Sequence, residues 1–294
     1  MQFCTAVNIA AFPVSENHLC YFAAMLAYQG LAHQTIKTYL AAVKHMHVLL
    51  AHPPLPEMPR LGLVMRGVHR MQPVLRKSTP RNRLPITPHI LQQLKGVWFT
   101  TPENPAAKML WAAVTMCFFG FFRSGEITTL GGQSGESQAQ LSWGDVLIDD
   151  VLKPTCVQIY LRRSKSDPFG HGVRVYIGST GTDLCPIQAI VEYTRSRSTQ
   201  AGPFFVFPDG TPLKKPTFVA EVRKAIQQAG LEAQDYAGHS FRIGAATAAA
   251  QAGMEDSLIQ TLGRWNSAAF LGYIRTPPQQ LAAASARLGQ LANT

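Results

Sequence analysis

A proline- and arginine-rich stretch, QPVLRKSTPRNRLPITP at residues 72–88, constrains the fold of this chain most. Proline removes a backbone donor and disfavours a helical residue before it, so neither a helix nor a central strand can run through the stretch. Such composition is typical of a linker. The 294 residues are enough for two ordinary domains. We therefore predict one domain at residues 1–81 and a second at residues 82–294.

The segment before the break has the spacing of amphipathic helices. We predict helices over residues 15–29, capped by Ser15, over 35–51 and over 59–71. In the second of these, a buried stripe and an opposite basic side are expected. The stripe consists of Ile36, Leu40, Val43 and Val48, and the basic side of Lys37 and Lys44. The first domain is then a small helical bundle with a positive face.

The segment after the break combines helices with a few strands. A helix is predicted from residue 88, and a strongly apolar, buried helix over residues 105–121. Residues 156–163 and 173–177 alternate apolar and polar around a turn-rich connection, which indicates a β-hairpin. The chain from about residue 183 is predicted to be mostly helical. The predicted fold class is therefore mainly α with a small antiparallel β-sheet.

The charge distribution points to a polyanionic partner. The net charge is +10, and residues 1–85 hold nine Lys and Arg against two Asp and Glu. A basic excess of this size favours nucleic acid as the partner, and an anionic membrane surface is the second choice. The remaining alternative is a solvated basic surface that binds no partner. We expect nucleic acid as the partner and no membrane association. The residues expected to bind it, which is DNA if the family resemblance described below holds, are Lys37, Lys44, Arg76, Lys77, Arg81 and Arg83.

Other features exclude several classes of protein. No uninterrupted apolar run reaches the roughly 18 residues of a membrane span, and the N-terminal segment lacks the positive start of a signal peptide. The five cysteines form no CxxC pair, so we expect neither a disulfide framework nor a bound metal. We expect an intracellular protein, nuclear if eukaryotic and otherwise cytoplasmic. The chain enters its first helix almost at once, as a fragment of a longer protein would.

Four short segments could carry chemistry, and each also has an ordinary structural explanation. They contribute Arg123 with Glu126, then Lys165, then His239 with Arg242, and finally Trp265 with Tyr273. The alternatives are a local ion pair, a solvated turn lysine, a capped helix start and core aromatic residues. His239 and Arg242 stand three apart, as neighbours on one helix face, and the small residues that follow would let another backbone come close.

Taken together, these residues suit phosphate chemistry. Guanidinium groups match phosphate oxygens in a bidentate manner and neutralise a pentacoordinate transition state. A tyrosine can act as a nucleophile, and a lysine can protonate a leaving oxygen. Tyr193 and Tyr236 are poorer nucleophile candidates than Tyr273, because neither follows Trp265 in the chain.

In order and spacing, Arg123, Lys165, His239-Ser-Phe-Arg242, Trp265 and Tyr273 resemble the signature of the tyrosine recombinase, or phage integrase, family. Trp265 stands where many members have histidine, as in Cre-like members, and precedes Tyr273 by one residue fewer than is usual. The resemblance covers about residues 86–285, and more weakly residues 1–81. The forms GRW and YIR are similar to those of eukaryotic mobile elements of the DIRS, Ngaro and Crypton kinds.

This resemblance implies a helical core-binding domain, a catalytic domain and DNA recombination or integration through a 3′-phosphotyrosine. In the implied mechanism Arg123 and Arg242 clamp the phosphate with help from Trp265 and His239. Tyr273 attacks, Lys165 protonates the leaving oxygen and Glu126 holds Arg123. No cofactor is implied, and the expected assembly is a homotetramer on DNA and a monomer without it. The alternatives are a catalytically silent DNA-binding protein and a type IB topoisomerase-like enzyme.

Overall fold

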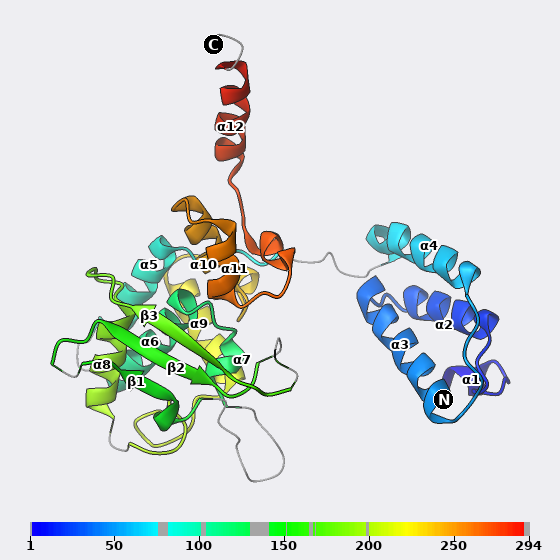
Figure 1. The fold of residues 1–294 in the computed structure, drawn as a ribbon, viewed down its shortest axis with the longest axis horizontal. Coiled ribbons are helices and arrows are strands. Elements are labelled where there is room, and N and C mark those ends of the chain that lie inside the picture. Colours follow the sequence, from blue (N-terminus) through cyan, green and yellow to red (C-terminus); the bar gives the residue numbers. More distant parts are fainter. Residues whose placement is uncertain are drawn as a thin grey trace. The chain divides into compact units, whose positions relative to one another are not determined.

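The computed structural model describes residues 2–75, 82–100, 104–129, 141–150, 152–164, 167, 169–197 and 200–290 (Figure 1). The chain divides into two compact units, Met1–Arg81 and Asn82–Thr294. Among the described helices, none combines the length and the apolar character that crossing a bilayer requires. No cluster of three or more potential metal ligands occurs among the residues with described positions.

The regular secondary structure in the described part of the first unit is helical. Its helices are α1 (Gln2–Ala6), α2 (Glu16–Tyr28), α3 (His33–Leu49) and α4 (Pro59–Leu75). The Ser15 hydroxyl accepts a hydrogen bond from the His18 backbone N–H at 3.2 Å, which confirms the predicted cap. The core joins α2, α3 and α4 through Leu19, Ile36 and Met65.

The predicted stripe on α3 is wrong at its last position. The Val48 side chain is 63% exposed, whereas His47 is buried. Ile36, Leu40, Val43 and His47 follow the three- and four-residue spacing of one face, and Val48 lies about 100° further around the helix. Buried His47 accepts a hydrogen bond at Nδ1 from the Val14 backbone N–H and donates one from Nε2 to the Pro53 carbonyl.

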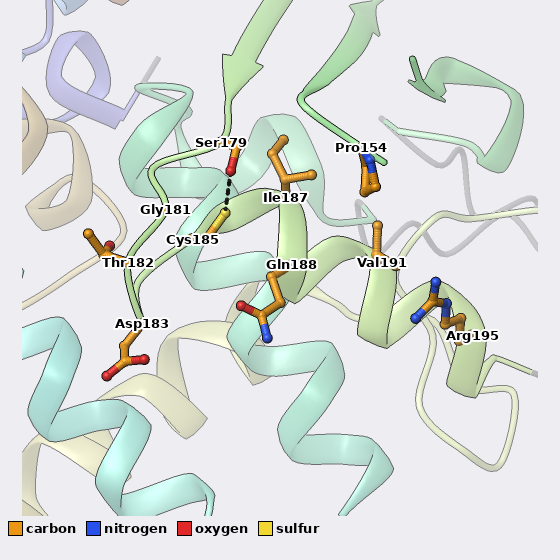
Figure 2. Close-up of a pocket in the computed structure, with 10 residues that line it drawn as sticks. All are labelled: Pro154, Ser179, Gly181, Thr182, Asp183, Cys185, Ile187, Gln188, Val191 and Arg195. Carbon is orange, nitrogen blue, oxygen red and sulfur yellow. Dashed lines mark hydrogen bonds between the residues drawn. The ribbon is translucent and has the colours of Figure 1, made fainter. Parts of the chain in front are cut away.

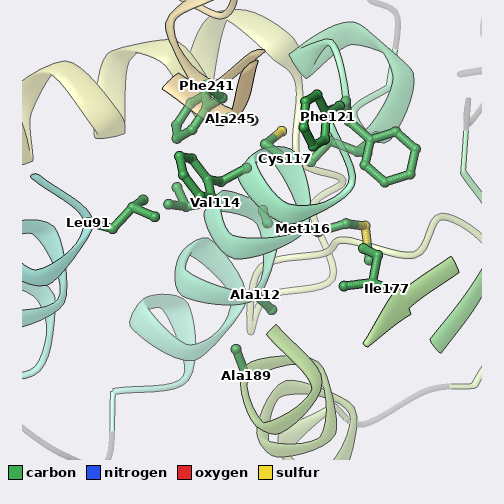
Figure 3. Packing of buried hydrophobic residues seen from close by; sticks show 14 of the residues in the cluster. Leu91, Ala112, Val114, Met116, Cys117, Phe121, Ile177, Ala189, Phe241 and Ala245 are labelled. Carbon is green, nitrogen blue, oxygen red and sulfur yellow. The ribbon is translucent and has the colours of Figure 1, made fainter. Parts of the chain in front are cut away.

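The second unit packs helices around a small sheet. Its α-helices are α5 (Pro88–Trp98), α6 (Pro105–Phe119), α7 (Ser124–Ile127), α8 (Pro186–Ser196), α9 (Lys215–Gln228), α10 (Ser240–Gln251), α11 (Asp256–Gly263) and α12 (Pro278–Gln290). Short 3₁₀ helices are η1 (Trp143–Asp145), η2 (Ala233–Asp235) and η3 (Ala268–Tyr273). The apolar helix predicted at residues 105–121 is α6. It occupies the middle of the core, with residues of α5, α8, α10 and β3 around it (Figure 3).

The sheet has three antiparallel strands in the order β1 (Val146–Ile148), β2 (Cys156–Leu161) and β3 (Val173–Gly178). β2 and β3 confirm the predicted hairpin, with Ile159 opposite Val175 and opposite Val146 of β1. β1 was not predicted, because three residues are too few to show alternation. The mainly α fold with a small antiparallel sheet is confirmed.

Part of the predicted linker is docked on the second unit. The Leu84 backbone N–H donates to the Asp235 carbonyl, and the Ile86 N–H donates to the Ser240 carbonyl, both at 3.0 Å. A Cβ added at Gly244 would lie 1.8 Å from the Ile86 carbonyl oxygen. The small residue in α10 therefore admits a second backbone, as the sequence predicts.

Candidate active site

Residues from four separate segments meet at one end of α10. Arg123 precedes α7, Arg242 lies in the first turn of α10, Trp265 follows α11, and Tyr273 ends η3. The Arg242 guanidinium lies 4.0 Å from the centre of the Trp265 ring and 5.7 Å from that of Tyr273. The structure thus brings together Arg242, Trp265 and Tyr273, which the sequence singles out separately.

Arg242 is the most deeply placed charged side chain of the cluster, with 0% of its surface exposed. Its Nη1 donates to the Phe121 carbonyl at 2.6 Å, and its Nη2 donates to the Gly263 carbonyl. Burial, and then repulsion from Arg123 and Arg264, lowers the pKa of Arg242 to about 9. Arg242 therefore stays charged at neutral pH. An anion beside the guanidinium would stabilise this buried charge.

Glu126 holds two arginines with one carboxylate. Arg123 Nη1 lies 2.8 Å from Oε1, and Arg264 Nη2 lies 3.1 Å from Oε2. The Arg123 backbone N–H also donates to Oε2, at 2.9 Å, which closes the turn of α7. The local Arg123–Glu126 ion pair is thus present. With Arg242 beside this pair, three guanidinium groups and one carboxylate leave an excess of two positive charges in a largely buried cluster.

Arg264 is the member of this cluster that the sequence analysis missed. Its side chain is 10% exposed, and its Nη1 donates to the Gly120 carbonyl at 2.9 Å. Burial lowers the pKa of Arg264, while the charge of Glu126 acts in the opposite direction. The only indication in the sequence was the position of Arg264 between Gly263, which ends α11, and Trp265. Nothing in that triplet shows that the side chain points inward rather than to solvent.

Trp265 is folded back against the end of α11. A Cβ at Gly263 would lie 1.5 Å from the indole ring, so only glycine leaves room for it. The Trp265 side chain is 8% exposed, and its Nε1–H has no hydrogen-bond partner among the described residues. Buried donors are nearly always paired, so an unused one beside a cationic cluster is available to an acceptor atom.

Tyr273 lies at the border of the cluster. Its ring is half-buried, 5.1 Å from the ring of Trp265. Its backbone carbonyl accepts a hydrogen bond from the Thr247 hydroxyl of α10 at 3.3 Å. Tyr193 and Tyr236 are both buried, and the Tyr193 hydroxyl donates to the Phe204 carbonyl at 2.8 Å. Tyr273 is the one of these three whose ring adjoins Arg242.

The remaining predicted residues differ in where the structure places them. His239 is exposed and caps the start of α10, where its carbonyl accepts from the Ile243 N–H at 3.0 Å. Lys37 is exposed and Lys44 partly buried on α3, while Arg83 donates to the Gln234 carbonyl. Outside the described residues lie Lys165, Arg76, Lys77 and Arg81.

A hollow lies at the N-terminal end of α8 (Figure 2). Cys185 caps this helix, and its Sγ lies 3.3 Å from the Ser179 hydroxyl oxygen. Burial opposes ionisation of the thiol, but hydrogen bonds from Ser179 and from the backbone outweigh it and lower the pKa of Cys185 to about 7. No sequence motif pointed to this thiol.

Part of the chain is similar in sequence to known proteins. Residues 155–273 match the model of the phage integrase family. An integrase/recombinase xerD homolog of Selenomonas ruminantium is 31% identical over 110 residues, which cover 35% of this chain and 32% of that relative. The match therefore spans about a third of the relative's length.

Two solved structures share the fold. The Tn1549 transposon integrase in complex with circular intermediate DNA has a TM-score of 0.57 at 14% identity, over 94% of this chain and 86% of the other. The XerH site-specific recombinase bound to palindromic difH substrate has a TM-score of 0.58 at 16% identity, over 92% of this chain and 69% of the other. The matched segment contains His239, Arg242, Trp265 and Tyr273, so this part of the chain is similar to the phage integrase family, and the two solved structures show that the chain shares their fold.

Proposed function

We propose that this chain cleaves and rejoins DNA through a covalent 3′-phosphotyrosine at Tyr273. The observation that carries the proposal is the largely buried cluster in which Arg123 and Arg264 pair with Glu126 and the neighbouring Arg242 lies beside the Tyr273 ring. A cluster with an excess of two positive charges is unfavourable unless an anion joins it. A phosphodiester in the act of being attacked is an anion whose charge grows, so this site would bind the transition state more tightly than the substrate.

In the proposed step, the Tyr273 oxygen attacks the scissile phosphorus and loses its proton, while the bond from phosphorus to the 5′-oxygen breaks. Arg123 and Arg242 neutralise the non-bridging oxygens, and the free Nε1–H of Trp265 donates to one of them. Lys165 protonates the departing 5′-oxygen, and His239 assists the proton transfer. A 5′-hydroxyl then reverses the reaction, so the linkage energy is retained and the route uses no cofactor.

Binding of a phosphate at Arg242 requires a rearrangement of the site. The guanidinium has no exposed surface and is covered by Trp265 and Tyr273. The proposal therefore includes an outward movement of the segment that carries Tyr273 when DNA binds. This movement would free the Tyr273 hydroxyl and at the same time expose the Arg242 guanidinium to the phosphate.

XerH and the Tn1549 integrase are bound to DNA in the structures that share this fold. For this chain we propose binding of double-stranded DNA through the basic residues of the first unit, with Lys37 and Lys44 on α3 among them. A tetramer on DNA and a monomer without it are also proposed, and sedimentation velocity with and without DNA distinguishes the two states.

Covalent trapping tests the proposed chemistry. Wild-type protein, Tyr273→Phe and Tyr176→Phe are incubated with a pool of nicked duplex fragments and denatured in SDS. Tyr176 is an exposed tyrosine on β3, and its variant is the matched control. We expect DNA-linked protein from wild type and from Tyr176→Phe, and none from Tyr273→Phe, whose loss of one hydroxyl leaves DNA binding unchanged.

The other outcomes identify the alternatives. An adduct that persists in Tyr273→Phe would assign the nucleophile elsewhere. Salt-sensitive DNA binding with no adduct from any protein would favour a DNA-binding role without catalysis. An adduct accompanied by relaxation of supercoiled DNA, but by no recombinant products, would favour a topoisomerase.

A further inference from the structure

Arg264 adopts a backbone conformation that favours glycine. It lies in the left-handed region, at φ 55° and ψ 47°, directly after α11. Its N–H donates to the Thr261 carbonyl and the Trp265 N–H donates to the Gln260 carbonyl, both at 3.0 Å. This is a Schellman ending, in which the left-handed residue is usually glycine because a Cβ is disfavoured there. A large side chain kept at such a position calls for a compensating role.

The guanidinium of Arg264 contacts three groups of the protein. Nη1 donates to the Gly120 carbonyl at 2.9 Å, and Nη2 donates to Glu126 Oε2 at 3.1 Å. The guanidinium carbon lies 4.8 Å from the centre of the Phe122 ring. These contacts join the end of α11 to the segment between α6 and α7, which lies more than a hundred residues earlier in the chain.

Through these contacts Arg264 binds the same acceptor groups that hold Arg123 and Arg242. It shares the Glu126 carboxylate with Arg123, which uses the other oxygen at 2.8 Å. It also shares the Phe121 carbonyl with Arg242, since Arg264 Nη2 lies 3.3 Å and Arg242 Nη1 lies 2.6 Å from that oxygen. Phe121 is itself left-handed, at φ 50°, so its carbonyl has a direction that few residues adopt.

We propose that Arg264 is a positioning residue that holds Arg123 and Arg242 at the spacing a phosphate requires. It acts on Arg123 through Glu126, and on Arg242 through the Phe121 carbonyl and the adjoining Gly263 carbonyl. Its Nη1 and Nη2 both donate to protein groups, and the positioning role requires no contact of Arg264 with the substrate. The effect on catalysis rests on the proposed function, whereas the effect on the two arginines does not.

The first test measures the two arginines directly, in the full-length chain without DNA. Side-chain Nε–H signals of Arg123 and Arg242 are observed by NMR and assigned with R123K and R242K. In R264G, glycine suits the left-handed backbone, so the fold is retained while the side chain is lost. We expect the Nε–H of Arg242 and of Arg123 to exchange with solvent at least about 10-fold faster than in wild type.

R197A is the matched control. Arg197 donates to the Phe204 and Ala201 carbonyls at 2.5 and 2.6 Å and stacks on Trp143, so it too is an arginine anchored to the backbone, but outside this cluster. Its removal should lower the Tm and leave both exchange rates unchanged. R264K, which keeps the positive charge and an aliphatic stem but not the planar fork, is measured in parallel and provides the comparison if R264G does not fold.

The second test measures adduct formation per folded protein with the nicked duplex pool, beside the Kd for a fluorescein-labelled duplex. R264G should give at least about 10-fold less adduct with the same Kd, because small misplacement of catalytic groups is costly. Unchanged exchange rates, or an adduct equal to wild type, would overturn the positioning role. If wild type forms no adduct, the proposed function fails, and the exchange rates alone decide whether Arg264 positions the arginines.

Discussion

Among the described residues, the second unit buries arginine side chains, whereas the first unit buries no arginine or lysine. In the first unit Arg60 is 65% exposed and pairs with Glu16 at 3.0 Å, and Lys37 is exposed on α3. In the second unit Arg242 is completely buried and Arg264 is 10% exposed. Exposed charges are screened by water and salt, so each contributes little to folding and can be replaced. Buried charges are strongly coupled, so their geometry is specified by every neighbour.

Glycines show the same contrast. Gly62 lies exposed on α4 with open space where a Cβ would be, whereas Gly244 in α10 faces the Ile86 backbone. The helices of the first unit therefore carry residues that the fold tolerates, while α10 carries residues that the fold requires. The difference arises because α10 is covered by other segments of the chain on most of its surface.

The largest effect should come from replacing a buried charge. Arg242→Ala leaves the Gly263 carbonyl without its donor, removes the packing against the Trp265 ring and opens a cavity. Unpaired buried carbonyls and cavities are each costly, so we expect a loss of about 3 kcal/mol or more in the free energy of unfolding. Urea denaturation followed by tryptophan fluorescence measures it. A variant as stable as wild type would mean that relief from burying the charge offsets these costs.

A smaller effect should distinguish the two glycines. Gly244→Ala places its Cβ 1.8 Å from the Ile86 oxygen, so α10 and residues 82–87 must move apart. We expect a loss of about 1–3 kcal/mol, typical of overpacking. Gly62→Ala should instead stabilise by about 0.5–1 kcal/mol, because alanine is the better helix residue. Hydrogen–deuterium exchange of α4 and α10 peptides reports each site. Equal changes in the free energy of unfolding at Gly62 and Gly244 would contradict the difference between α4 and α10.

The smallest effect on folding should come from the lysines of α3. Lys37→Ala with Lys44→Ala should change the free energy of unfolding by less than about 0.5 kcal/mol per site. On the proposed DNA-binding role, the slope of log K against log salt should become less negative by up to about 0.9 for each phosphate that the variant no longer neutralises. Fluorescence anisotropy with a labelled duplex at several salt concentrations measures the slope. The double variant Lys153→Ala with Lys214→Ala, which removes two exposed lysines of the second unit, is the control for net charge.

Much of the fold could be predicted because it depends on local patterns. Apolar spacing located the helices over α2, α3, α4 and α6 to within a few residues, and alternation located the β2–β3 hairpin. The errors occurred where the local pattern was too short or ambiguous. β1 has three residues, and Val48 differs from His47 only by one step around α3.

The identity and order of the candidate residues, from Arg123 to Tyr273, could be read along the chain, because residue type and spacing are local properties. Which of these residues meet depends on long-range packing. Arg242 and the Phe121 carbonyl lie 121 positions apart, and their hydrogen bond exists because α10 packs on α6. Arg264 joined the cluster for the same reason. Its inward direction depends on the left-handed end of α11 and on the carboxylate that α7 supplies, and no local pattern encodes both.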